Sequence, residues 1–341
     1  MNENNYLHTD NARRRLLVAG VALPALAWAG AARAQAKPPI LIGWLHADSR
    51  ESSGRYLGAF KEGLAALGWK EGSQIVIEER WADGQGARLQ ALAEELAAKK
   101  PVLIVAAPTT VIRPVAKAAP STPIVMASGG DPVLWGLVKS LARPGGMITG
   151  LTNFNIGISE KYLELLLAAA PKVKRVGVLS GRTTGGDDTG RSLSTEAVRR
   201  SAVQYKVEAR FAEVAKAEDI EPAIARLAKE GSQALVVTLN PLLRIERRRV
   251  MKLALAQRWP VVAGVSEYAD EGALLSYSAD ALANYRRAAY YVDRILKGAK
   301  PADLPFEQST KFEFVLNLKT AKALGLTIPQ SILVRADRVI E

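Results

Sequence analysis

Short polar side chains recur where apolar segments of strand length end, and these are the residues whose chemistry could serve a function. Their hydroxyl, amide and carboxylate groups suit hydrogen bonding to a small polar molecule, and the N-termini of following helices add backbone donors for a carboxylate. We therefore expect a ligand-binding site. The candidates are His46, Asp48, Ser49, Thr109, Thr110, Ser128, Asp131, Asn153, Phe154, Asn240, Glu267 and Tyr268.

Three of these candidates suggest particular contacts with a ligand. Asp131 could hold an ammonium group, and Phe154 or Tyr268 could stack on a flat molecule. The polar candidates also have an ordinary explanation, because Ser, Thr, Asn and Asp are common N-caps at strand-to-helix junctions. Asp131 before Pro132 fits a cap followed by the first helical turn. Only the recurrence of such groups after the strands of both halves of the chain favours binding.

Residues for catalysis are sparse. Beyond position 36 the only histidine is His46, and the chain has no cysteine, so paired-histidine sites, thiolate metal sites and cysteine nucleophiles are excluded. The sequence has no Gly-x-Ser-x-Gly elbow and no phosphate-binding loop, and no Gly-rich dinucleotide turn follows the first strand. We predict no catalytic residues, no metal and no cofactor; a hydrolase is the less favoured alternative.

The charge balance is basic, with a formal net charge of +12 over 341 residues. Residues 1–36 hold four arginines against one Glu and one Asp, a net +2, which leaves +10 for the rest. The densest later cluster is Arg244, Arg247, Arg248 and Arg249. No nucleic-acid motif accompanies it, so we interpret it as a solvated helix face and expect no nucleic-acid partner.

The N-terminus is predicted to be a cleaved export signal, residues 1–36. Arg13–Arg15 precede an apolar run from Leu16 to Ala32, and the run ends in the small-x-small pattern Ala34–Ala36. The paired arginines suggest twin-arginine export, and general secretion is an almost equal alternative. Without a cysteine there is no lipid anchor, so we expect a free protein in the periplasm.

The remaining chain alternates between strand and helix patterns. Strands are predicted at 40–45, 74–81, 102–106, 124–126, 175–180, 206–211, 234–239, 260–263 and 273–277. Helices are predicted at 54–67, 89–100, 111–118, 133–141, 159–169, 189–205, 220–229, 245–258 and 280–297. This alternation predicts an α/β fold with parallel sheets covered on both faces.

Two runs of this alternation, divided near Gly150–Asn153, predict two doubly wound lobes. Ligands of such sheets bind beyond the carboxyl ends of the strands. With two lobes, those ends can face each other across a cleft.

Several stretches resemble one known family, the ABC-transporter substrate-binding proteins of the tryptophan/tyrosine type, a branch of the type I periplasmic binding proteins. The resemblance spans nearly all of the chain after the signal. The stretches that carry it are Ala59–Trp69, Ile77–Ala82, Gly130–Val138, Leu141–Leu151, Arg294–Pro305 and Asn317–Pro329.

The resemblance implies two Rossmann-like lobes joined by a three-segment hinge, with crossovers near residues 149–153, 277–280 and 305–310. The N-terminal lobe would comprise 37–151 and 280–306, and the C-terminal lobe 152–279 and 307–341. The long helix at 280–297 would return to the first lobe. Asp131 and Asn240 match positions that are often polar in the family's pocket, and Thr109 and Thr110 lie in its usual loop.

Two departures from the family pattern lie near the expected cleft. The turn after Ser180 reads Gly-Arg-Thr-Thr-Gly-Gly-Asp-Asp instead of a Trp-Asn-Pro-like turn, and Trp135 replaces a small residue. An aromatic amino acid is therefore not assumed as the ligand. The resemblance implies a monomeric solute-binding component that hands a small organic molecule, such as an amino acid or a related carboxylate or aromatic solute, to an ABC transporter permease. The alternative is a ligand-sensing protein for a membrane receptor.

Overall fold

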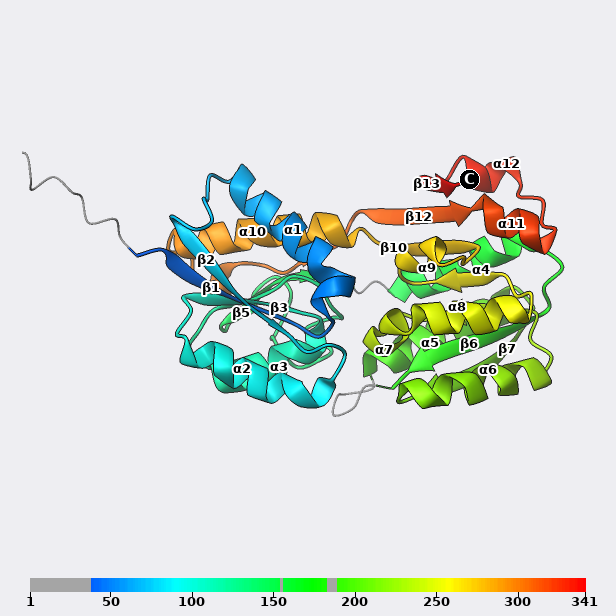
Figure 1. The fold of residues 1–341 in the computed structure, drawn as a ribbon, viewed down its shortest axis with the longest axis horizontal. Coiled ribbons are helices and arrows are strands. Elements are labelled where there is room, and N and C mark those ends of the chain that lie inside the picture. Colours follow the sequence, from blue (N-terminus) through cyan, green and yellow to red (C-terminus); the bar gives the residue numbers. More distant parts are fainter. Residues whose placement is uncertain (1–37, 154–155, 183–188) are drawn as a thin grey trace, which may run out of the picture. The chain divides into compact units, whose positions relative to one another are not determined.

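The structure, a computed structural model, describes residues 38–153, 156–182 and 189–341, and its compact part runs from Ile40 to Glu341. Within that part the strands form two separate sheets with helices packed on them (Figure 1). The predicted fold class, with two α/β lobes of mostly parallel strands, is confirmed. None of the helices in the described ranges is both long and apolar enough to cross a membrane.

The N-terminal lobe is built on a six-stranded sheet in the order β11-β5-β4-β3-β1-β2, with all pairs parallel. Its strands are β1 (Ile40–His46), β2 (Ile75–Trp81), β3 (Leu103–Ala107), β4 (Ile124–Met126), β5 (Ile148–Thr152) and β11 (Glu307–Gln308). Its helices are α1 (Arg50–Ala66), α2 (Leu89–Ala98), α3 (Thr109–Ala118) and α10 (Ala281–Leu296), with short 3-10 turns at Gly86–Arg88 and Pro301–Asp303.

The C-terminal lobe has a seven-stranded sheet in the order β13-β12-β10-β9-β8-β6-β7. Its strands are β6 (Arg175–Gly181), β7 (Glu208–Val214), β8 (Ala234–Val237), β9 (Val261–Ala263), β10 (Leu275–Ala279), β12 (Phe312–Asn317) and β13 (Arg338–Ile340). Its helices are α4 (Ile156–Ala169), α5 (Thr189–Gln204), α6 (Ile220–Lys229), α7 (Pro241–Ile245), α8 (Arg247–Ala256), α9 (Glu267–Asp270), α11 (Leu318–Leu324) and α12 (Gln330–Leu333), with a 3-10 turn at Ala217–Asp219.

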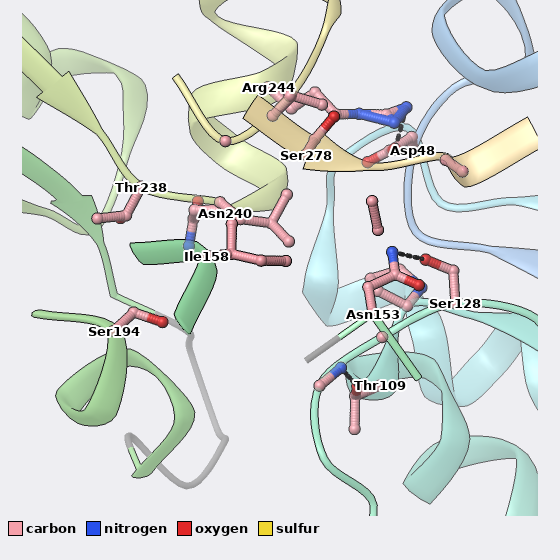
Figure 2. Close-up of a pocket in the computed structure, with 18 of the residues that line it drawn as sticks. Asp48, Thr109, Ser128, Asn153, Ile158, Ser194, Thr238, Asn240, Arg244 and Ser278 are labelled. Atoms are coloured by element: carbon pink, nitrogen blue, oxygen red, sulfur yellow. Dashed lines mark hydrogen bonds and ion pairs between the residues drawn. The ribbon is translucent and has the colours of Figure 1, made fainter. Parts of the chain in front are cut away.

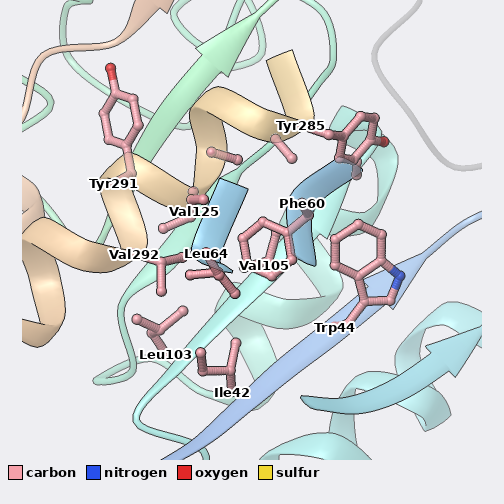
Figure 3. Packing of buried hydrophobic residues seen from close by; sticks show 14 of the residues in the cluster. Ile42, Trp44, Phe60, Leu64, Leu103, Val105, Val125, Tyr285, Tyr291 and Val292 are labelled. Atoms are coloured by element: carbon pink, nitrogen blue, oxygen red, sulfur yellow. The ribbon is translucent and has the colours of Figure 1, made fainter. Parts of the chain in front are cut away.

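Each sheet separates two hydrophobic layers, because successive side chains of a strand point to opposite faces. In β3, Leu103 and Val105 join the layer under α1 and α10, whereas Ile104 and Ala106 join the layer under α2 and α3. Figure 3 shows the first of these layers, in which Phe60 packs among the strand side chains. Strands buried on both faces explain why these segments are apolar runs without alternation.

Three chain crossovers connect the lobes. They follow β5, β10 and β11, and helix α10 packs against α1 in the N-terminal lobe. Strand β11 pairs with β5, Glu307 opposite Leu151 and Gln308 opposite Thr152. The prediction assigned residues from 307 onward to the C-terminal lobe, whereas β11 is a strand of the N-terminal sheet.

Some predicted elements are wrong. Residues 133–141 form turns and irregular structure instead of a helix, because Gly136 adopts a left-handed φ of 62° that ends any helical turn. The helix predicted at 245–258 is present as α8, and the short helix α7 before it was not predicted. Strand β12 runs antiparallel to β10, so the second sheet is not purely parallel.

Candidate functional site

A cavity of about 230 Å³ lies where the carboxyl ends of both sheets meet, as the fold rule for such sheets predicts (Figure 2). Its N-terminal wall comes from the residues after β1, β3, β4 and β5, and its C-terminal wall from the ends of β6, β8, β9 and β10. Drug-sized pockets usually have volumes of about 300–1,000 Å³. This smaller cavity suits a solute of amino-acid size.

Most of the residues predicted from the sequence line this cavity. They come from both lobes, and in Figure 2 the labelled members of the two walls lie on opposite sides of an open space. The set is His46, Asp48, Thr109, Thr110, Ser128, Asn153, Asn240 and Glu267. Asn240 is at the same time the N-cap of α7, because its side chain accepts a hydrogen bond from the Leu243 N–H.

Three predicted ligand contacts are not among the lining residues. Ser49 caps α1 by accepting from the Ser52 N–H at 3.2 Å, and Asp131 accepts from the Val133 N–H at 2.8 Å. Tyr268 is fully buried, and its hydroxyl donates to the Leu243 carbonyl at 2.6 Å. Ser49 is thus a helix N-cap, Asp131 stabilises the turn that follows it, and Tyr268 makes a structural hydrogen bond. Phe154 lies outside the described residues.

Sequence reasoning missed Arg244, which was interpreted as part of a solvated helix face. Its side chain lies in the cavity wall and is only 8% exposed. Arg247 and Arg248, in contrast, pair with Glu271 away from the cavity. The signal that could have identified Arg244 is its place one helical turn after the N-cap Asn240, beyond the end of β8.

Arg244 connects the C-terminal lobe to the N-terminal lobe through several polar contacts. Its Nη2 lies 2.7 Å from Oδ2 of Asp48 and also contacts the Ser53 hydroxyl. Its Nη1 donates to the Tyr56 hydroxyl at 3.3 Å. Because Asp48 and Arg244 are both buried, neither charge is left to water in this arrangement.

A second ion pair joins the lobes with the charges exchanged, the cation on the N-terminal lobe and the anion on the C-terminal lobe. Arg55 of the N-terminal lobe lies 2.6 Å from Oε1 of Glu267 in the C-terminal lobe, and the Tyr56 hydroxyl donates to the same oxygen at 3.0 Å. Burial alone would raise the pKa of Glu267, but Arg244 and Arg55 outweigh it and lower that pKa. We call these six residues, Asp48, Ser53, Arg55, Tyr56, Arg244 and Glu267, the interlobe ion cluster.

The interlobe ion cluster keeps some binding capacity. Oδ1 of Asp48, Nε of Arg244 and Oε2 of Glu267 are buried and have no partner in the described part of the chain. Unsatisfied buried polar atoms are unfavourable, so these atoms are available for polar groups of a solute.

His46 lies deep in the N-terminal wall, 3% exposed. Burial lowers its pKa to about 4, Asp48 opposes this shift and Arg244 adds to it, so the ring is neutral at pH 7. Its Nδ1 accepts a hydrogen bond from the Asp48 N–H at 3.1 Å, and its Nε2 lies 2.9 Å from the Tyr285 hydroxyl. The ring of Tyr285 stacks on that of Tyr56 at 4.7 Å, which joins His46 to the interlobe ion cluster.

Beside the cavity, neutral side chains connect the three crossovers. Asn284 of α10 donates from Nδ2 to Oδ1 of Asn153 and to the Ser309 hydroxyl, both at 2.6 Å. These three residues follow β5, β10 and β11, so each belongs to a different crossover. Asn153 in turn donates to the Ser128 hydroxyl at 2.8 Å (Figure 2). We call Asn153, Asn284 and Ser309 the hinge amide cluster.

The geometry of this site supports recognition of a solute. Among the described residues, no group of three or more His, Asp or Glu side chains is placed to hold a metal ion. His46 has both ring nitrogens in contacts with Asp48 and Tyr285. What remains is a buried, mixed polar and aromatic cavity that two lobes close together, and this combination defines a two-lobed solute-binding protein.

The particular family follows from comparison with known proteins. Residues 46–340 match the ABC transporter substrate binding protein family, so the chain belongs to it. It is a solute-binding component of this transporter class. A tyrosine-binding protein of Clostridioides difficile is 27% identical over 267 residues, which is 78% of this chain and 75% of that protein.

Two solved structures resemble the fold in different states. The structure of an ABC domain from Streptococcus pneumoniae in complex with L-Trp has a TM-score of 0.81 at 26% identity and covers 89% of this chain and all of that one. A ligand-free, open substrate-binding protein from Clostridium difficile has a TM-score of 0.66 at 25% identity, with 88% and 99% covered. The present lobe arrangement is thus more similar to the ligand-bound structure.

Proposed function

We propose that this chain is the periplasmic solute-binding component of an ABC importer, exported through residues 1–36 as a free protein. The lobes close on a small zwitterionic or carboxylate solute, and a permease of the importer receives it from the closed form. The observation that carries this proposal is the cavity itself, which is lined by the strand ends of both sheets and bridged by ion pairs between the lobes, one of them buried.

The composition of the cavity supports an amino acid or a related molecule. Asp48 and Glu267 offer unpartnered carboxylate oxygens for an ammonium group, and hydroxyls and the first turn of α3 surround the opposite region. Trp135 and Tyr162 add aromatic surface. The tyrosine and L-Trp named for the relatives belong to the same chemical class.

Hinge closure requires only that the solute bind the closed arrangement better than the open one. A solute that contacts both walls at once meets this condition, because opening removes one set of contacts.

Thermal denaturation in the presence of a solute panel tests the proposal. The full chain is expressed with its N-terminus intact, and the exported protein is purified from the periplasm. L-tryptophan, L-tyrosine, aliphatic amino acids, aromatic acids, nucleosides and sugars are then compared. A true ligand at a hundredfold excess over its Kd stabilises the protein by about 2.7 kcal/mol. If no member of the panel raises the melting temperature, solute capture is wrong; retention in the cytoplasm would contradict the export step.

A further inference from the structure

The hydrogen bonds that start at His46 have a fixed direction, which specifies the group of the solute that this wall can bind. This step rests on the proposed function. A neutral imidazole has one donor and one acceptor nitrogen. Nδ1 must be the acceptor, since the Asp48 N–H points at it from 3.1 Å. Oδ2 of Asp48 lies 3.7 Å from Nδ1, which is too far for a competing hydrogen bond.

The proton of the ring is therefore on Nε2, where it is donated to the Tyr285 oxygen at 2.9 Å. Because that oxygen already accepts from His46, the hydroxyl hydrogen of Tyr285 must point elsewhere. The neighbouring group that can accept it is the Ser128 hydroxyl, which is close enough to hydrogen bond with Tyr285.

Ser128 is itself already an acceptor. The amide nitrogen of Asn153 donates to its oxygen at 2.8 Å, and Asn153 is oriented by Asn284, which donates to the Asn153 carbonyl oxygen. The hydroxyl hydrogens of Tyr285 and Ser128 are the two that have no acceptor assigned. At most one of them can lie between the Tyr285 and Ser128 oxygens, so at least one remains to be donated elsewhere. Neither hydroxyl donates to any other group in the described part of the chain, and both residues line the cavity.

We propose that His46 is a positioning residue: it occupies the Tyr285 oxygen as a donor, so that the pair of hydroxyls of Tyr285 and Ser128 keeps a hydrogen to donate to the solute, and this wall selects an oxygen acceptor, a carboxylate. The location agrees with this chemistry. Ser128 precedes Gly129, and an added Cβ on Gly129 would lie 2.8 Å from the Thr109 nitrogen at the start of α3. Thr109 and Thr110, the first residues of α3, line the same cavity, and the N-terminus of a helix favours negative charge nearby.

The tautomer of His46 can be measured without any ligand. His46 is the only histidine after position 36, so nitrogen NMR of histidine-labelled protein purified from the periplasm gives one ring system, and its loss in a His46→Gln variant confirms the assignment. We expect a neutral His46 ring with the proton on Nε2 at pH 7. A proton on Nδ1, or a charged ring, would overturn the proposal whatever the solute is.

Binding calorimetry with matched probes tests the donors. L-tryptophan and L-tyrosine are compared with tryptamine and tyramine, which lack only the carboxylate. Ser128→Ala and Tyr285→Phe should each weaken binding of the amino acids by about tenfold and leave binding of the amines nearly unchanged. Tyr291→Phe is the matched control, because Tyr291 lies on the same helix and donates to the Pro305 carbonyl outside the cavity.

A His46→Leu variant should show the same selective loss, and His46→Gln, whose amide can still donate to Tyr285, should restore much of it. Equal weakening for amino acids and amines in these variants would mean a merely structural role and would refute the assignment. If the wild-type protein bound none of the four probes, tryptophan and tyrosine would be excluded as solutes, the proposed function would be decided by the wider panel, and the tautomer measurement would still decide the role of His46.

Discussion

Two chemically different clusters lie where the lobes meet. The hinge amide cluster contains only neutral donors and acceptors, and it sits on three crossovers that remain covalently continuous in any lobe arrangement. The interlobe ion cluster consists of four charged groups and two hydroxyls on segments that meet only through space, α1 and the loop before it on one side and α7 and α9 on the other. The hinge amide cluster is therefore held together by the continuous chain, whereas the interlobe ion cluster must form its contacts each time the lobes close.

This difference shows how a closure can be firm and still reversible. Neutral groups buried at the hinge would be left unsatisfied by opening, so their bonds favour a constant local geometry. Charged groups can be rehydrated when the lobes separate, which compensates much of the lost attraction. The ion cluster should therefore control the balance between open and closed forms, and the amide cluster should control the geometry about which they move.

The largest expected effect is that of Arg244→Ala. The substitution leaves Asp48 and Glu267 buried without their shared cation, and breaking a buried pair in this way costs about 3–5 kcal/mol. Since 1.4 kcal/mol is a factor of ten, the affinity for any panel solute should fall at least a hundredfold. Small-angle scattering should show a larger radius of gyration than for the wild-type protein.

Arg248→Ala is the control for this change, because Arg248 lies on the neighbouring helix α8, is 76% exposed in its side chain and pairs only at the surface with Glu271. It should bind and scatter like the wild type. If Arg244→Ala did so too, the ion cluster would have no part in closure.

A second large effect concerns pH and the N-terminal wall. The pKa of His46 is about 4 in the folded protein because of burial, against an ordinary value of 6.5. Between these values the unfolded chain takes up a proton that the folded protein refuses, so the free energy of unfolding decreases as the pH falls from 6.5 to 4. The difference amounts to about 3 kcal/mol.

Urea unfolding of the wild type and of His46→Gln at several pH values isolates this contribution. Asp48, Arg244, Tyr56 and Tyr285 also face His46 and are the same in both proteins. The wild type should lose about 3 kcal/mol more than the variant between pH 6.5 and 4. Parallel curves would show that His46 is not the group that titrates.

A smaller effect is expected at the hinge. Asn284→Leu keeps the approximate size of the side chain and removes both hydrogen bonds, which leaves Asn153 and Ser309 without their donor. The free energy of unfolding should decrease by about 1–3 kcal/mol in urea titrations. Ser309→Ala removes only one partner and should have less effect; a larger effect than that of Asn284→Leu would contradict the central position of Asn284.

Much of the fold could be predicted from the sequence, because buried parallel strands such as 102–106 are apolar runs bounded by helical patterns. The errors occurred where local patterns are ambiguous. Residues 133–141 have helical spacing, yet Gly136 imposes a left-handed turn. Strand β12 is partly exposed and lies after the last crossover, so neither its existence nor its antiparallel direction was predicted.

For the site, we took polar residues directly after predicted strands as candidates, and this strand-end rule identified many residues of the cavity wall. It could not identify residues on helices. Arg244 and Tyr56 are 188 positions apart, and only the closed arrangement of the lobes brings them together. Tyr285 belongs to a helix whose sequence shows an ordinary apolar face. Conversely, Ser49 and Asp131 satisfy the same strand-end rule as Asp48, because a capping side chain and a binding side chain have the same chemistry.

The smallest expected effect comes from the rim of the interlobe ion cluster and separates burial from charge. Arg55 pairs with Glu267 at 2.6 Å, but its side chain is 42% exposed, so water and salt screen this pair far more than the pair of Arg244 with Asp48. Arg55→Ala should weaken solute binding by less than about 1 kcal/mol, and this loss should disappear in calorimetry at high salt. The loss caused by Arg244→Ala should persist there, since its partners are buried. Equal salt sensitivity of the two variants would show that the cluster is solvated throughout, and closure would then depend on the solute and on apolar contacts such as that of Ile245 with Gly84.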